Sequence, residues 1–314
     1  MRDFRSICLT AGLGLAALGG WDANVQAAPL GEGAAPIKIA INEWTGQNVT
    51  AHVAGHLLEK LGYHVQYVTA GSFPQWIGME DGSLDMTPEL WTNNLGDIYP
   101  KLLAEKKVEP VGDLGLNARD GWAYTSATLA VCPGLPDWKA LLKPECAAAL
   151  ATAETLPNGR LVDYPADWDT ASAKEIEDFK VPFTAVPAGS EGALVAELQS
   201  ALAAKQPLLL RFWAPHWLLA QTKELNWVDM PPCNPKDGGR CILPSPVIKV
   251  VRAGFGEKWP AAYALMKQYQ LAADDQQKMM FEIDQNHKPI DDVVGQWLEA
   301  NSAKWSGWVE DARK

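Results

Sequence analysis

The stretch IKIAINEWTGQNVTAHVAGHLLEKLGYHVQYV, residues 37–68, decides the fold. Its first five residues form a short β-type run, and a helical pattern follows from Asn48 to Leu61 and closes at Gly62. Residues 63–68 then alternate like a strand. This strand–helix–strand unit predicts a parallel sheet whose ligand crevice lies at the carboxyl ends of the strands, where we expect Trp44.

The pattern continues along the chain. A helix is predicted around Trp76 to Asp81 and a strand around Leu84 to Met86, so Trp91 also lies just past a strand end. Later segments repeat the α/β alternation: a β-rich run at 123–131, a strand at 160–163, a helix at 191–204, strands at 207–213 and 247–251, and helices over 257–314.

These elements predict an α/β protein of two lobes, each a mostly parallel sheet flanked by helices, with two crossovers between them. Such a clamshell closes around a small solute. The expected ranges are 29–125 for the first part of lobe one, 126–230 for lobe two, and 231–314 for the return to lobe one and the C-terminal helices.

Composition and the N-terminus narrow the function classes. The 314 residues carry 27 Lys and Arg against 38 Asp and Glu, a formal charge of −11, so we expect no nucleic-acid partner. Residues 1–28 resemble an export signal, with Arg2 and Arg5 before an apolar run and a small-residue cleavage site near Ala27 or Ala28. We therefore expect a monomeric protein located in the periplasm.

Removal of that signal leaves four cysteines, an even number typical of exported chains. We expect two local disulfides, Cys132 with Cys146 and Cys233 with Cys241, because each pair closes a short loop. Neither pair shows C-x-x-C spacing or a neighbouring histidine, so we expect no zinc site there.

Catalytic motifs are missing from the sequence. It holds no H-E-x-x-H, no G-x-S-x-G elbow, no P-loop and no dinucleotide fingerprint, so we expect neither an enzyme nor a cofactor. His52 and His56 lie four residues apart on the predicted helix, a spacing at which two histidines can share a metal ion. Because no carboxylate is identified as a third ligand, surface or interlobe histidines are the favoured interpretation.

Tryptophan is unusually abundant, with 14 Trp against 7 Tyr and 7 Phe. Indole is the strongest cation–π partner among side chains, and a quaternary ammonium is recognised by surrounding it with such rings. Trp44, Trp91 and Trp213 each end or follow a predicted strand, so we expect them to form a cage. Core packing is the default expectation for Trp76, Trp138, Trp227, Trp259, Trp297, Trp305 and Trp308, and Trp122 and Trp217 remain spare cage candidates.

Three segments resemble quaternary-amine-binding proteins of ABC importers, the receptors for glycine betaine, proline betaine, choline and carnitine. They are INEWT at 41–45, GSLDMTPELW at 82–91 and WAPHW at 213–217, the last being the most specific. The resemblance covers roughly residues 36–310. It implies a type II periplasmic binding protein, an aromatic box for a trimethylammonium group, and the membrane permease of an ABC importer as partner.

The resemblance also carries individual residues over. Trp44, Trp91 and Trp213 match box positions, and Tyr124 resembles a further aromatic of choline receptors. His216 matches a carboxylate-contacting position of betaine receptors.

The segment YPADWDT, residues 164–170, resembles a binding loop in lobe two of betaine receptors. There Trp168 adds a cage wall, while Asp169 and Thr170 precede a helix whose first backbone N–H groups can meet a ligand carboxylate. Choline-binding relatives carry an acidic residue shortly after the first Trp, where this chain has residues 45–47, TGQ. That departure favours a ligand with its own carboxylate, such as a betaine.

Two other interpretations stay open. A receptor of the same fold for an amino acid such as histidine or proline would bind without dependence on N-methylation. An exported carbohydrate-binding protein or hydrolase would use tryptophans to stack on sugar rings and would pair carboxylates across the cleft, for which Glu43 and Glu89 are the candidates.

Overall fold

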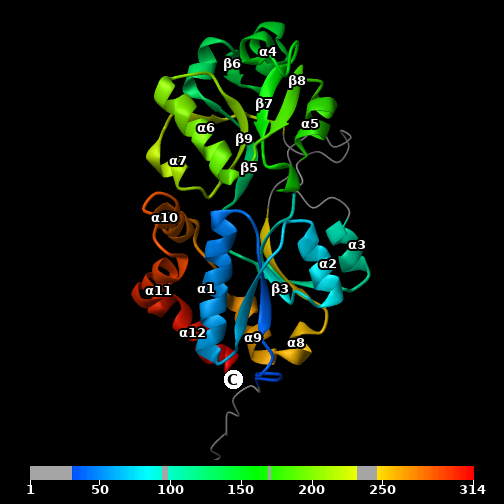
Figure 1. Cartoon of the computed structure of the whole chain (residues 1–314), viewed down its shortest axis with the longest axis vertical. Helices are drawn as coiled ribbons and strands as arrows, with labels where there is room; N and C mark the ends of the chain where they lie inside the picture. The colour runs from blue at the N-terminus through cyan, green and yellow to red at the C-terminus, as the bar shows by residue number, and fades with distance from the viewer. Residues whose placement is uncertain (1–29, 94–97, 169–170, 232–245) are drawn as a thin grey trace, which may run out of the picture.

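The computed structural model describes residues 30–93, 98–168, 171–231 and 246–314. The expected signal at 1–28, the expected Cys233–Cys241 disulfide, and the expected site residues Asp169 and Thr170 lie outside these ranges. Figure 1 shows two lobes arranged along the long axis of the molecule, each built on one sheet.

The first lobe, in the lower half of Figure 1, contains a sheet in the order β2-β1-β3-β11-β4. Its strands are β1 (Ile37–Ile41), β2 (Val65–Thr69), β3 (Met86–Trp91), β4 (Val108–Asp113) and β11 (Val247–Arg252). The strand–helix–strand prediction is confirmed, because β1 pairs in parallel with β2 and β3. β11 is antiparallel to β3 and β4, since the chain re-enters this sheet from the other lobe.

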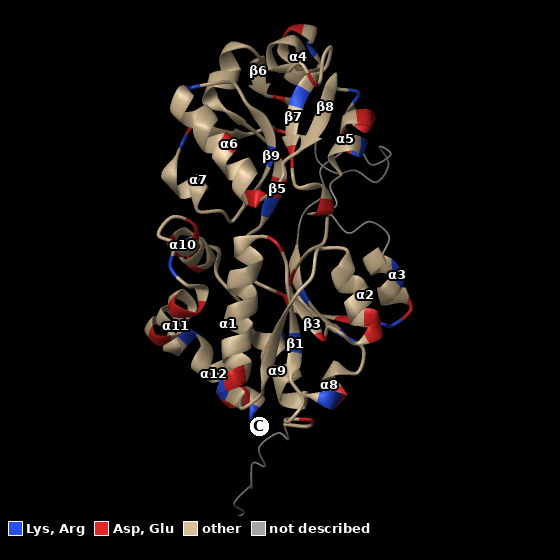
Figure 2. Ribbon diagram, in the orientation of Figure 1, with Lys and Arg blue, Asp and Glu red and all other residues tan. Residues whose placement is uncertain are grey.

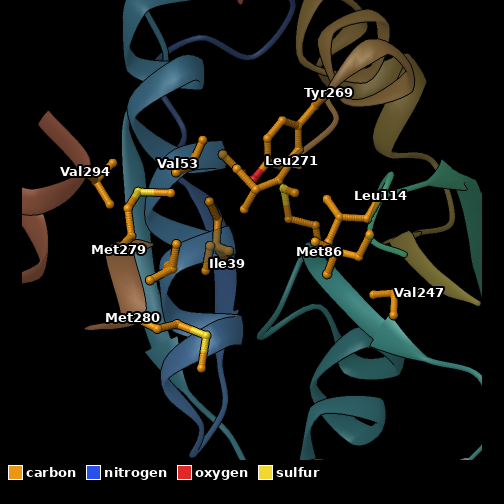
Figure 3. Packing of buried hydrophobic residues seen from close by; sticks show 14 of the residues in the cluster. Ile39, Val53, Met86, Leu114, Val247, Tyr269, Leu271, Met279, Met280 and Val294 are labelled. Carbon is orange, nitrogen blue, oxygen red and sulfur yellow. The ribbon is translucent and has the colours of Figure 1, made fainter. Parts of the chain in front are cut away.

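Helix α1 (Thr45–Leu61) lies against this sheet and is covered on its other side by C-terminal helices (Figure 1). It ends at Gly62, whose φ of 104° is left-handed and strains any residue with a side chain. Figure 3 shows Val53 of α1 among buried apolar side chains that include Met279 and Val294. Residues more than 200 positions apart thus share one core.

The second lobe contains a sheet in the order β10-β5-β9-β7-β8. Its strands are β5 (Arg119–Thr125), β7 (Gly159–Asp163), β8 (Phe183–Pro187), β9 (Leu209–Ala214) and β10 (Leu225–Trp227), with a short β6 (Pro133–Pro136) nearby. β7 is parallel to β8 and β9, whereas β5 is antiparallel to β9. The two-lobed α/β fold is confirmed, and each sheet is mixed because the strands next to the crossovers run antiparallel.

β5 corrects two sequence expectations. Residues 119–125 pair with β9 and β10, so they belong to the second sheet and not to lobe one, as the expected boundary at residue 125 placed them. The expected β-rich run at 123–131 continues as a 3-10 helix from Ser126 to Ala130. Strand propensity in that run is overridden by the hydrogen bonds of Thr125 and Thr128 to the backbone around Leu208.

Helices complete both lobes. The first lobe holds α2 (Pro74–Asp81), α3 (Ile98–Ala104), α8 (Phe255–Lys258), α9 (Pro260–Gln268), α10 (Ala273–Asp284), α11 (Ile290–Ala300) and α12 (Ser302–Ala312). The second holds α4 (Pro144–Leu150), α5 (Ser172–Phe179), α6 (Glu191–Ala204), α7 (Leu218–Gln221) and 3-10 helices η1 (Ser126–Ala130), η2 (Trp138–Leu142) and η3 (Ala166–Trp168). The disulfide between Cys132 and Cys146 is confirmed. Within the described ranges, no helix is both long and apolar enough to cross a bilayer.

Candidate ligand-binding site

A cavity lies between the lobes, at the carboxyl ends of β1, β3, β7 and β9. The cavity volume is about 60 Å³, which is room for a small solute. Its lining comprises Trp44, Ser72, Phe73, Gln75, Trp76, Glu89, Leu90, Trp91, Asp120, Tyr164, Trp168 and Trp213. The predicted location of the ligand crevice is therefore where the structure has its cavity.

Each cage tryptophan reaches the cavity from the end of a strand or the turn after it. Trp44 follows β1 and precedes α1, and Trp91 is the last residue of β3. On the other lobe, Trp213 lies near the end of β9, and Trp168 ends the 3-10 turn that follows β7. We call these four residues the indole cage.

The rings of the indole cage meet across the two lobes. The ring centroids of Trp44 and Trp168, from opposite lobes, are 5.2 Å apart with a 58° angle between the planes. Trp168 and Trp213 meet edge to face at 5.6 Å. Tyr164 packs edge-on against Trp213 at 5.5 Å and fixes its orientation. Tilted rings of this kind present several π faces to one enclosed volume.

Glu89 holds the first-lobe half of the cage. Its Oε1 accepts hydrogen bonds from the indole Nε1 of both Trp44 and Trp91, each at 3.0 Å. Its Oε2 accepts from the Thr50 hydroxyl at 2.6 Å and from the Gln276 amide at 2.8 Å. All four donors are neutral, so the Glu89 carboxylate is not paired with a cation, and it lies at the N–H edges of two cage rings.

Asp120 provides the second carboxylate of the cavity, and the buried Arg211 guanidinium compensates its charge. Arg211 is 1% exposed and donates from Nη2 to Asp120 at 2.5 Å and from Nη1 to Glu175 at 2.7 Å. The Tyr164 hydroxyl donates to the other oxygen of Asp120 at 2.8 Å. Burial raises the pKa of Tyr164 well above its usual value, so this hydroxyl stays a donor.

The indole N–H of Trp168 is a buried hydrogen-bond donor. Among the described residues, its indole Nε1 has no acceptor, whereas the Nε1 atoms of Trp44 and Trp91 are both engaged by Glu89. A buried N–H without an acceptor costs free energy.

Contacts beside the cavity join the lobes. The Glu191 carboxylate of α6 accepts from the Thr45 backbone N–H at 2.9 Å, and Trp217 donates to Asp284 at 2.8 Å. Burial, with the nearby charge of Asp284, raises the pKa of Glu191 to about 8. Since both contacts connect one lobe to the other, they stabilise the closed arrangement.

Two expected site residues do not line the cavity. Tyr124 pairs with Leu209 at the far end of the second sheet, while Asp120 pairs with Trp213 at the cavity edge. Since β5 is antiparallel to β9, its first residues face the ligand side and Tyr124 packs in the second-lobe core. Tyr124 is therefore corrected from a cage wall to a core residue.

His216 lies behind the cavity. It is fully buried, its ring meets Trp213 edge to face at 4.9 Å, and its Nδ1 accepts from the Leu218 backbone N–H. Burial lowers its pKa to about 3, so the imidazole is neutral. This corrects the expected contact with a ligand carboxylate: the side chain supports Trp213 instead.

Sequence reasoning gave Glu89 a role only as a hydrolase carboxylate, named Tyr164 only as part of the 164–170 loop, and did not name Asp120 or Gln75. Glu43 is exposed and lies outside the cavity lining, and Glu89 is saturated by four hydrogen bonds. The paired carboxylates of a hydrolase are therefore not formed by these two residues. Glu89 lies two residues before Trp91 on the same strand, and residues two apart on a strand face the same side of the sheet. That spacing could have assigned Glu89 to the cage. Trp76 packs in the core as expected and also touches the cavity.

A family model described as the substrate-binding domain of the ABC-type glycine betaine transport system, OpuAC, matches residues 35–300. The chain belongs to this family. The resemblance seen in the three sequence segments is thereby confirmed, and the protein is a substrate-binding protein of an ABC importer of this type, with the importer's permease as partner.

Individual relatives agree with this assignment. The trimethylamine N-oxide-binding protein of Pelagibacter ubique is 29% identical over 290 residues, covering 88% of this chain and 91% of that protein. The glycine betaine/L-proline-binding protein ProX of Borrelia burgdorferi superposes with a TM-score of 0.73 at 18% identity, covering 89% and 98% of the two chains. Lactococcal OpuAC in its closed form with glycine betaine superposes with a TM-score of 0.69 at 18% identity, covering 87% of this chain and 99% of that one. The two structures support the shared fold.

Proposed function

We propose that this protein captures a small zwitterion with a fully methylated nitrogen, of the trimethylamine N-oxide or glycine betaine kind, and presents it to the importer. The observation that carries the proposal is that indole rings from both lobes line one cavity, with the Glu89 carboxylate at the N–H edges of two of them. The relative from Pelagibacter is a trimethylamine N-oxide-binding protein, and the family description names glycine betaine.

The charges of the cavity suit such a ligand. A methylated cation over the cage rings gains on the order of 1–2 kcal/mol from each ring when desolvated. Three or four such rings, with one polar contact, approach the roughly 8 kcal/mol that micromolar binding requires. Arg211 is already engaged by two carboxylates, so its charge is not left free to pair with the ligand's anionic oxygen.

Ligand calorimetry tests the proposal. We expect micromolar binding of trimethylamine N-oxide or glycine betaine, with proline betaine, carnitine and choline completing the panel. The matched control is 3,3-dimethylbutanoate, which keeps the shape and carboxylate of glycine betaine but has carbon in place of nitrogen. Equal affinity for glycine betaine and this analogue would rule out recognition of the cation. Preferential binding of histidine or proline would instead establish the amino-acid receptor.

The same proposal includes the absence of catalysis and an extracytoplasmic location. The ligand is to be recovered unchanged after incubation with the protein, which nuclear magnetic resonance of the methyl groups measures directly. The mature chain is to begin near residue 28 or 29 when the full sequence is expressed in a Gram-negative host, as determined by mass spectrometry of the periplasmic fraction. Demethylation of the ligand, or an uncleaved cytoplasmic chain, would contradict these two parts separately.

A further inference from the structure

Two histidines and one carboxylate meet on the outer side of the first lobe. His52 and His56 lie one turn apart on α1, and Asp291 lies in the first turn of α11. Figure 1 shows α1 and α11 as neighbouring helices at the edge of the lobe, and Figure 2 shows acidic residues on α11. A third candidate ligand, which the local sequence did not identify, is thus brought to the histidines from more than 230 residues away.

The ligating atoms are close enough to share one ion. The Asp291 Oδ1 is 2.8 Å from Nδ1 of His52 and 3.3 Å from Nε2 of His56. One ligand atom from each of the three residues lies within 4.8 Å of the others. In a tetrahedral zinc site, with bonds of roughly 2.0–2.2 Å, donor atoms are about 3.3–3.6 Å apart. Small side-chain rotations therefore suffice to form the site.

The surroundings orient both imidazoles. The other nitrogen of His56, Nδ1, lies 3.5 Å from the carboxylate of Glu59, the carboxylate–histidine arrangement that directs the remaining nitrogen to a metal. The His52 ring stacks on Tyr67 with centroids 4.1 Å apart and planes 13° from parallel. Gly55 makes this stack possible, since a Cβ at that position would lie 2.1 Å from the Tyr67 hydroxyl oxygen.

An ion can reach these atoms from solvent. The exposed fractions of the side chains are 13% for His52, 28% for His56 and 66% for Asp291, so the histidines are held by packing while one side stays open. Two imidazoles and a carboxylate are the donor set favoured by zinc and neighbouring divalent transition metals, and water can fill the remaining coordination position.

We propose that His52, His56 and Asp291 bind one divalent transition-metal ion of the zinc type, which fastens α11 to α1. The site is separate from the ligand cavity, none of whose lining residues it contains. Its effect is structural, because it joins two helices that lie far apart in the sequence.

The experiment uses the mature chain without a polyhistidine tag, stripped with a chelator and titrated with zinc chloride in a calorimeter. We expect one equivalent to bind with a Kd of 10 µM or lower. A free zinc concentration a hundredfold above Kd should raise the Tm by roughly 5 °C. In His56→Ala and in Asp291→Asn the Kd should rise at least tenfold, while His64→Ala, which removes an exposed histidine outside the cluster, keeps the wild-type value.

Cobalt(II) provides a second readout, because its visible absorption reports bound imidazole and carboxylate directly. The proposal would be overturned if the wild-type protein bound no zinc. It would also be overturned if His56→Ala and Asp291→Asn both bound zinc with the wild-type Kd. A loss in His56→Ala alone would also overturn it, since the metal would then not involve α11. Betaine or N-oxide affinity, measured on the same variants, should stay within twofold and shows that they are folded.

Discussion

Replacing Glu89 with Gln tests whether its charge, and not only its shape, contributes to the site. The amide oxygen can keep the two bonds from Trp44 and Trp91, so the cage should survive. The amide nitrogen then faces Thr50, whose hydroxyl can turn to accept, and Gln276, with which one hydrogen bond is lost. We expect a loss of stability of about 1–2 kcal/mol.

The effect on binding follows from the missing charge. For a cation above the rings, at about 7 Å from the carboxylate and an effective dielectric constant of about 20, the attraction is about 2 kcal/mol. That energy corresponds to roughly a 30-fold change in Kd. Glu89→Gln should therefore raise the Kd of a methylated cation by about that factor. The Kd of 3,3-dimethylbutanoate, which has no charge on its tertiary-butyl end, should stay unchanged or fall slightly.

Calorimetry with both ligands distinguishes this account from simple damage to the cage. Glu105→Gln, which removes an exposed charge from the same lobe, serves as the control and should change neither Kd. An equal rise in Kd for the cation and for its carbon analogue would show that Glu89 acts only by positioning the indoles. A cation affinity within twofold of wild type would refute the electrostatic reasoning.

Three further outcomes follow from the geometry. Trp91→Ala should weaken the methylated ligand more than tenfold in calorimetry with little change in Tm, because this ring is only half buried at the end of β3; an unaltered Kd would exclude it from the cage. Burial raises the pKa of Glu191 from 4.5 to about 8 in the closed form, so closure is favoured when Glu191 is protonated. Ligand affinity should therefore fall as the pH rises from 4.5 to about 8 and then level off. Glu191→Gln, which keeps an acceptor for Thr45, should flatten that profile, and an equal slope in both proteins would contradict the reasoning. Changing Cys132 and Cys146 to Ser together opens a loop with a sequence separation of 14, which should lower the free energy of unfolding in urea by about 3 kcal/mol; ligand affinity serves as the control and should not change.

Local sequence patterns predicted the elements that depend on residues close in the chain. The opening unit of β1, α1 and β2 and the bounds of α6 are as expected, because apolar spacing and the glycine at the helix end act within a few residues. The placement of Trp44 and Trp91 at the cavity followed as well, since the carboxyl ends of parallel strands converge at one edge of a sheet.

Other features arise from contacts between distant segments, which local periodicity does not encode. Tyr124 was misplaced because the direction of β5 is set by its pairing with β9, some 90 residues later. The donors to Glu89 come from α1, β3 and α10, and the partner of the two α1 histidines comes from α11. The amino-acid sequence alone thus determined the lobed α/β architecture and the kind of ligand an excess of indole attracts. Tertiary structure decided which rings face the same cavity and which carboxylate accepts their N–H groups, because those relations depend on how the helices and strands pack in space.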